Sequence, residues 1–124
     1  MEYRICFYTT SWGKCYIRDY MDSLEADNLE FLGLVLAKLE RMKAPQCHRD
    51  PLVKPIAGKK YKEIRPGGSN TARLFYVVYE RDIVLLLSGY TKKEMKLRPS
   101  ELRLADSIYD DLKKGGGYYE EYEI

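Results

Sequence analysis

The hydrophobic period of the sequence changes near residue 53, and this change limits the chain to folds that combine helices with consecutive strands. Over residues 29–42, apolar residues recur every three or four positions, which predicts an amphipathic helix. Further on the period is two, and residues 71–79 and 82–90 are rich in residues that favour strands. Only two residues separate these runs, so the sequence predicts a tight β-hairpin.

The N-terminal third predicts a strand followed by a pair of helices. Residues 3–9 are rich in strand-forming side chains, and Cys15–Ser23 has the pattern of a short helix. Residues 27–30 (Asp-Asn-Leu-Glu) resemble a capping box at the start of the next helix. We expect that helix to end before Pro45, because a proline disfavours helical geometry in the preceding residue.

The segments around the hairpin complete the predicted order of elements. Residues 53–64 alternate apolar and basic side chains, with an interruption at Ala57-Gly58, and are either one bent strand or a turn followed by a strand. Residues 66–70 (Pro-Gly-Gly-Ser-Asn) are a strong turn signal. Pro99 opens a final helix, and the three glycines at 115–117 end it.

The resulting order is β-α-α-β-β-β-α, which indicates an α+β domain. We expect a mostly antiparallel sheet of about four strands, with an N-terminal helical hairpin and a C-terminal helix. A chain of 124 residues is long enough for one domain, which we assign to residues 1–114. Residues 115–124 form a glycine-led, acidic and tyrosine-rich tail that is either mobile or docked on the domain.

Several classes of protein are disfavoured by what the sequence lacks. No apolar run approaches the roughly 18 residues of a membrane-spanning helix. The N-terminus does not resemble a signal peptide, so we expect a cytoplasmic protein. The three cysteines have no zinc-site spacing, and we expect free thiols, no metal and no cofactor.

Charge is strongly segregated along the chain. Residues 54–98 carry a net charge of +7, whereas residues 1–53 carry −1 and residues 99–124 carry −4. A concentrated basic segment favours a polyanionic partner, because phosphate contacts release counterions. The alternative is that these lysines and arginines merely solvate exposed strands.

One sheet face is predicted to gather groups that could act on a phosphate. Tyr61, Glu63 and Arg65 share a face if residues 61–65 are a strand, because side chains alternate. The turn at 66–70 would bring Arg73 back beside them, and Lys92 and Lys93 follow the next strand. The alternative is a solvated face with cross-strand Glu–Arg pairs.

The order of these motifs resembles the RelE/ParE toxin superfamily, in its HigB-like, phage-derived branch. The resemblance rests on the lysine-rich segment, Tyr61-x-Glu63-Ile64-Arg65, the glycine-rich turn, residues 72–76 (Ala-Arg-Leu-Phe-Tyr) and residues 89–93 (Gly-Tyr-Thr-Lys-Lys). It covers roughly residues 1–113 and leaves the tail without a counterpart. It implies a RelE-like fold and the toxin of a type II toxin–antitoxin module, an mRNA interferase that cuts mRNA on the ribosome.

The resemblance also implies roles for individual residues. Arg65 and Arg73 match arginines that contact the scissile phosphate, and Glu63, Tyr61, Lys92 and Lys93 fall where catalytic groups stand. Lys59, Lys60, Lys62 and Lys96 belong to the basic surface that would bind RNA. The implied partners are the ribosome, mRNA and a cognate antitoxin with a helix-turn-helix DNA-binding domain. The histidine that some members use has no matching position here.

The reaction implied is attack of a ribose 2′-OH on its adjacent phosphate, which inhibits translation by cleaving mRNA. Two other functions remain open from the sequence. The same fold could serve as a gyrase inhibitor that cuts no RNA, or as a plain RNA-binding module.

Overall fold

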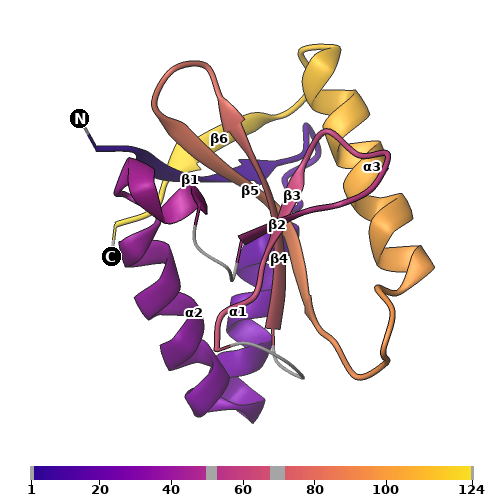
Figure 1. Ribbon diagram of the computed structural model, residues 1–124. Coiled ribbons are helices and arrows are strands. Elements are labelled where there is room, and N and C mark those ends of the chain that lie inside the picture. The colour runs from indigo at the N-terminus through magenta and orange to yellow at the C-terminus, as the bar shows by residue number, and fades with distance from the viewer. Residues whose placement is uncertain (1, 50–52, 68–71, 124) are drawn as a thin grey trace.

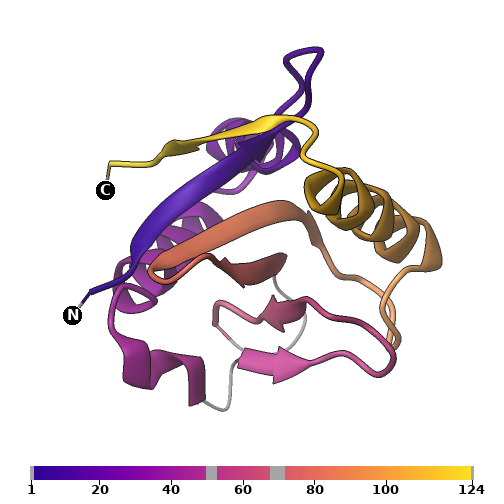
Figure 2. The same cartoon turned by 90° about the horizontal axis from the view of Figure 1, so that it is seen from above.

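The fold is a six-stranded sheet with helices on both faces (Figures 1 and 2). The computed structural model describes residues 2–49, 53–67 and 72–123. Its elements, in chain order, are β1 (Arg4–Thr9), α1 (Tyr16–Asp27), α2 (Leu29–Arg41), a 3-10 helix (Pro45–Arg49), β2 (Val53–Pro55), β3 (Lys62–Ile64), β4 (Ala72–Tyr79), β5 (Ile83–Thr91), α3 (Pro99–Lys113) and β6 (Tyr118–Glu121). The predicted α+β class, with its helical hairpin and C-terminal helix, is confirmed.

The strands lie in the order β2-β3-β4-β5-β1-β6. All neighbouring pairs are antiparallel except β1 and β5, which run parallel. The α1–α2 hairpin and three strands separate these two in the chain, which provides the long connection that a parallel pair needs. The predicted hairpin of residues 71–79 and 82–90 is β4 and β5, with Tyr79 opposite Ile83. Residues 68–71, which include most of the predicted turn, lie outside the described residues.

The expectation of about four strands is wrong, for two local reasons. Residues 53–64 form two short strands, because the chain reverses at Gly58, whose φ of +76° favours glycine. Val53 then pairs with Ile64, and Pro55 with Lys62. The sixth strand comes from the C-terminal tail, which pairs with the free edge of β1.

Alternation along the central strands sends side chains into two separate cores. Ile5, Phe7, Val84 and Leu86 face α1 and α2, where Ile17 and the other apolar residues of the helical hairpin cover them. The intervening residues face α3, where Ala105 and Ile108 are buried. Figure 2 shows the two helical layers on opposite sides of the sheet. Strands buried on both faces read as continuous apolar runs, which explains the sequence Ile-Val-Leu-Leu-Leu in β5.

The start of α2 differs in detail from the predicted capping box. The cap is Asn28, whose side-chain oxygen accepts a hydrogen bond from the Phe31 backbone N–H at 3.1 Å. Leu29, expected within the buried stripe, is 68% exposed and is the first residue of the helix. Val35 and Leu39 of the same stripe are fully buried.

The C-terminal tail is docked on β1. β6 runs antiparallel to β1 from Tyr118 opposite Thr9 to Glu121 opposite Cys6. Beyond it, the Tyr122 backbone N–H donates to the Ile5 carbonyl at 2.8 Å, and the Tyr122 ring stacks on Phe7 with centroids 4.6 Å apart. The chain reaches this edge through Gly117, where a Cβ would lie 2.6 Å from the Thr9 carbonyl oxygen. Glycine is therefore required at this crossing.

In the part of the chain that the structure describes, no helix is both long and apolar enough to cross a membrane.

Candidate functional site

The structure brings Glu63, Arg65 and Arg73 together into a charge cluster on the sheet face that α3 partly covers. Glu63 in β3 lies opposite Phe75 in β4, two residues beyond Arg73, so the side chains of Glu63 and Arg73 point to the same face. Arg65 follows β3 directly and its Nε donates to Oε1 of Glu63. The register confirms that Glu63 and Arg73 share one face, as predicted, and the hydrogen bond to Glu63 places the Arg65 guanidinium beside them.

Burial divides the cluster into an inner and an outer part. The side chain of Glu63 is only 2% exposed, whereas that of Arg65 is 37% exposed. Arg73 is 1% exposed, and its guanidinium donates to the Ala72 carbonyl at 3.1 Å. Among the described residues, Oε2 of Glu63 has no hydrogen-bond partner. Arg65 is therefore the member of the cluster that a ligand in solvent could reach.

The electrostatic state of Arg73 reflects its position inside the cluster. Burial lowers the pKa of its guanidinium, and the neighbouring Glu63 carboxylate opposes this shift. Arg65 acts in the same direction as burial, because two like charges disfavour each other. The buried carboxylate of Glu63 thus binds Arg65 directly and acts on Arg73 through its electrostatic field.

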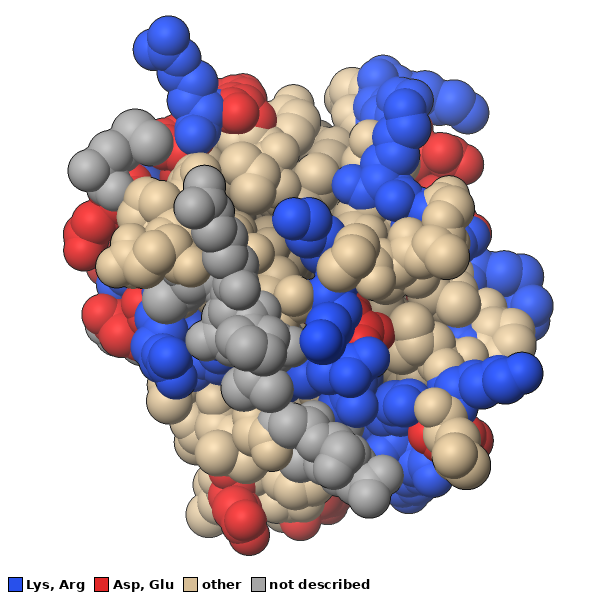
Figure 3. All heavy atoms as spheres, in the orientation of Figure 1, with Lys and Arg blue, Asp and Glu red and all other residues tan. Residues whose placement is uncertain are grey.

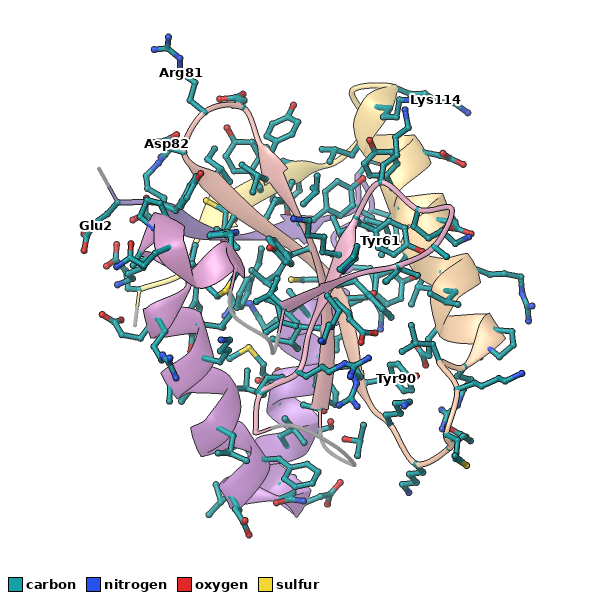
Figure 4. The ribbon with its side chains drawn as sticks, in the orientation of Figure 1. Glu2, Tyr61, Arg81, Asp82, Tyr90 and Lys114 are labelled. Carbon is teal, nitrogen blue, oxygen red and sulfur yellow. The ribbon has the colours of Figure 1, made fainter. Side chains whose placement is uncertain are left out.

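Tyr61 shares this face, but α3 covers it. Its hydroxyl donates to Oδ1 of Asp106 at 2.7 Å and approaches the Leu102 carbonyl at 3.2 Å. Lys59 also binds Asp106, with its Nζ 2.7 Å from Oδ2, and this contact lowers the pKa of the Asp106 carboxyl. Burial and the Asp106 contact raise the pKa of Tyr61 above its usual value. Figure 4 shows Tyr61 between the sheet and α3, where it ties the β2–β3 loop to the helix.

The lysines of the basic segment occupy different parts of the surface. Lys60 is exposed in the β2–β3 loop, whereas Lys62 lies opposite Tyr76 and so points to the face of α1 and α2. Lys92 donates to the Met95 carbonyl at 2.8 Å, and Lys93 and Lys96 are exposed on the β5–α3 connection. Figure 3 shows basic atoms across the centre and right of this view, over the β2–β3 hairpin and that connection.

Tyr90 and Arg98 join the site, although the sequence analysis singled out neither as a site residue. Tyr90 in β5 lies directly opposite Arg73. Its hydroxyl accepts from the Arg98 backbone N–H at 3.0 Å, and the Arg98 guanidinium lies 5.2 Å from the centre of its ring. Burial raises the pKa of Tyr90, and the Arg98 hydrogen bond opposes the shift. The signal was present in residues 89–93, where strand alternation places Tyr90 on the face of the cluster.

A pocket of about 470 Å³ opens beside Tyr90, at the end of β5. We call it the β5-end pocket. It lies between α1, the last residues of β5 and the first turns of α3, and Figure 4 shows Tyr90 at this end of the strand. Its walls are Tyr16, Asp19, Tyr20, Ser23, Gly89, Tyr90, Thr91, Lys93, Arg98, Glu101 and Leu104.

The only histidine, His48, lies on the opposite side of the sheet from the charge cluster. Its Nε2 is 3.2 Å from the Met42 carbonyl oxygen, which can only accept, so Nε2 carries a proton. Its Nδ1 is then free to accept from the Tyr76 hydroxyl at 3.0 Å. Burial lowers the pKa of His48. In residues 2–49, 53–67 and 72–123, no three His, Cys, Asp or Glu side chains gather closely enough to hold a metal ion.

Comparison with known proteins identifies the family. No curated protein matches the chain significantly. A family model described as "Phage derived protein Gp49-like (DUF891)" matches residues 19–110. The matched region holds the whole charge cluster, Tyr61 and Tyr90, and almost all of the β5-end pocket. Because the match spans most of the chain, this protein belongs to the phage-derived Gp49-like family, a HigB-like family of the RelE superfamily.

Proposed function

We propose that this protein is the toxin of a type II toxin–antitoxin module and acts as a ribosome-dependent mRNA endoribonuclease. The observation that carries the proposal is the charge cluster, in which buried Glu63 holds the half-exposed guanidinium of Arg65. A fixed guanidinium offers a planar fork of donors that suits a phosphate. Membership of the Gp49-like family supports the toxin role.

The proposed reaction is cleavage by the neighbouring ribose. The 2′-oxygen forms a bond to phosphorus, and the bond from phosphorus to the 5′-oxygen breaks. The 2′-hydroxyl proton passes to a base, and the leaving 5′-oxygen takes up a proton, so the products are a 2′,3′-cyclic phosphate and a 5′-hydroxyl. Negative charge grows on the phosphate oxygens in the transition state, where a preorganised donor lowers the barrier most.

The two arginines take different roles in this proposal. Arg65 contacts the phosphate, because its side chain is 37% exposed. Arg73 is a positioning residue, since it is buried and acts through Glu63 and the electrostatic field at the site. For proton transfer, the accessible candidates are Lys92 and Lys93, whereas the Glu63 carboxylate is buried and could act only if the substrate displaced its covering side chains. Tyr61 is a weaker candidate, because its hydroxyl already donates to Asp106.

The partners in this proposal are the ribosome with its mRNA and a cognate helix-turn-helix antitoxin. The exposed lysines, Lys60, Lys93 and Lys96, would contribute to RNA binding in a salt-dependent way. The ribosome would supply much of the substrate positioning, which can account for several kcal/mol of the barrier.

A second function is favoured by one observation. The single histidine lies away from the charge cluster and is already bonded to Tyr76 and Met42, so it offers no acid or base to the site. A gyrase inhibitor with the same fold would need no acid or base at this site.

The test is to induce the protein in cells and map mRNA 5′ ends, comparing the parent with Arg65→Ala, Arg65→Lys and a control, Arg81→Ala. Arg81 lies in the β4–β5 turn, far from Tyr61 and Tyr90 (Figure 4). We expect codon-phased cuts from the parent and the control, and a loss of about a hundredfold or more from Arg65→Ala, as for removal of one preorganised donor. Lysine should restore little, because an ammonium lacks the fork. Cuts at the parental rate from a folded Arg65→Ala variant would refute the site, and arrested replication with intact mRNA would favour gyrase inhibition.

A further inference from the structure

We propose that the β5-end pocket binds the base of a nucleotide next to the scissile phosphate and selects bases that carry an exocyclic amino group. This inference rests on the proposed function, because it takes RNA to be the ligand. It adds a site to the charge cluster and assigns it a chemical preference.

The pocket is adjacent to the charge cluster through Tyr90. Tyr90 is the cross-strand neighbour of Arg73 and also lines the pocket. Its ring stacks on Phe75, with centroids 6.2 Å apart and planes 28° apart, so the wall between the cluster and the pocket is rigid. A strand whose phosphate lies at Arg65 would therefore have an adjoining base within reach of the pocket.

Aromatic rings line the pocket and are held in fixed positions. Tyr20 packs closely against β5 because Gly89 has no side chain, and a Cβ at that position would be 2.8 Å from the Tyr20 ring. The Tyr20 hydroxyl is 2.9 Å from the hydroxyl of Thr91, which fixes the ring in the other direction. Tyr16 completes the aromatic lining. Unpaired bases of single-stranded RNA stack on such rings, and stacking accepts every base.

Selectivity must then come from the four charged side chains of the pocket, and two of these are already engaged. Asp19 binds Lys14 at 2.6 Å, and Arg98 binds Glu94 at 3.0 Å while it covers the Tyr90 ring. Glu101, half-buried on the first turn of α3, has no ion pair or side-chain hydrogen bond with the described residues. Its carboxylate is therefore available to a ligand.

A carboxylate can only accept hydrogen bonds, so it discriminates between bases. The amino groups of cytosine, adenine and guanine donate to it, as the C4 amino group of cytosine donates to Glu or Asp in nucleic-acid complexes. Uracil presents a carbonyl oxygen where cytosine has that amino group, and the carboxylate repels this oxygen. Lys93 at the pocket can contact the phosphate of the same nucleotide without affecting this choice.

The experiment is an NMR titration of the full chain with cytidine monophosphate, uridine monophosphate and inorganic phosphate, following the backbone amides of Gly89 and Thr91. We expect the cytidine nucleotide to shift these amides with a Kd about tenfold below that of the uridine nucleotide, the discrimination of one good hydrogen-bonded contact. Inorganic phosphate should leave them nearly unshifted. Equal Kd values for the two nucleotides, or shifts that phosphate reproduces, would overturn the proposal without the use of any variant.

Two variants assign the preference to one side chain. Glu101→Gln replaces the carboxylate with an amide that both donates and accepts, so the cytidine preference should fall below about threefold if one such contact supplies it. Asp110→Asn removes the same charge from the far end of α3 and should keep the preference. A Glu101→Gln protein that retains the full preference would refute the role of Glu101. If the amide shifts give a lower Kd for the cytidine nucleotide than for the uridine nucleotide but no mRNA is cut in cells, the nuclease proposal fails and the base-binding proposal stands.

Discussion

Replacement of Glu63 by glutamine should destabilise the protein far more than the loss of one surface charge does. The substitution keeps the shape of the side chain but removes the negative charge that binds Arg65 and acts electrostatically on Arg73. The Glu63 side chain is 2% exposed and Arg73 is 1% exposed, so water cannot compensate Arg73 for the lost negative charge nearby. Breaking a buried charge pair by removing one partner costs about 3–5 kcal/mol.

The lower end of that range is appropriate here. Arg65 is 37% exposed and can turn to solvent, so its share of the loss is small, and the cost comes mainly from Arg73. A loss of about 3 kcal/mol is a large part of the roughly 5–15 kcal/mol that stabilises most domains. With a typical urea m-value of about 1–3 kcal/mol/M, the unfolding midpoint should fall by about 1–3 M.

Urea unfolding, followed by circular dichroism, measures this change. Glu40→Gln is the matched control, because the Glu40 side chain is 55% exposed and its pair with Lys43, at 3.1 Å, is a surface pair worth less than about 1 kcal/mol. Adding Arg73→Met to Glu63→Gln should cost less than the sum of the two single changes, since the second removes the charge that the first leaves buried. A midpoint for Glu63→Gln equal to that of the control, or strict additivity in the double variant, would refute this reasoning.

Three further predictions follow from contacts elsewhere in the fold. Tyr61→Phe removes the hydrogen bond to Asp106 and should lower the free energy of unfolding by about 1 kcal/mol. RNA cleavage should stay near the parental rate if the phenol is only structural. A large loss of cleavage in a folded variant would show that the Tyr61 hydroxyl takes part in the reaction. His48 should titrate in NMR below its ordinary pKa of about 6.5, because burial lowers its pKa. The unfolded chain then takes up this proton at a higher pH than the folded protein does, so the free energy of unfolding should fall as the pH drops from about 6.5. His48→Gln, measured alongside, should lose this part of the pH dependence. Deletion of residues 115–124 uncovers the edge of β1 and should lower the melting temperature and promote self-association, which sedimentation would detect; an equally stable monomer would show that β6 does not protect this edge.

Local pattern was sufficient for most of the fold. The helical stripe that buries Val35 and Leu39, and the β4–β5 hairpin, each depend on residues close together in the sequence. The parallel placement of β1 beside β5 was not predicted, because it joins segments about 80 residues apart in the sequence. Residues 53–64 stayed ambiguous, because two strands of three residues are too short to show a clear period.

The sixth strand could not be predicted, because its partners lie at the other end of the chain. The tail is acidic and follows three glycines, which locally favours an unstructured segment. Its docking depends on distant contacts, such as the Tyr8 hydroxyl that donates to the Gly116 carbonyl at 3.3 Å, and the Tyr122 ring on Phe7. No pattern within residues 115–124 encodes these contacts.

Alternation placed the charged residues on the correct face but not at the correct depth. Glu63 and Arg73 are of types that are almost always exposed, yet the folded chain buries both. The same alternation places Lys62 and Glu63 on opposite faces of the sheet. The predicted RNA-binding surface, which joins Lys62 to Lys59 and Lys60, does not take this into account. The role of these residues in RNA binding and cleavage stays a prediction.

The candidate site and the terminal strands are separable parts of this protein. The family match begins in α1 and ends in α3, so it holds the charge cluster but neither β1 nor β6. β6 is the outermost strand and pairs with β1, which in turn pairs with β5 along the half that runs from Ile83 to Leu86. Tyr90 and the β5-end pocket lie beyond Leu86, where the pairing of β5 with β1 has ended. Changes in the tail should therefore alter stability and association through β1, whereas changes at Arg65 or Glu101 should alter the chemistry of the site and leave the sheet intact.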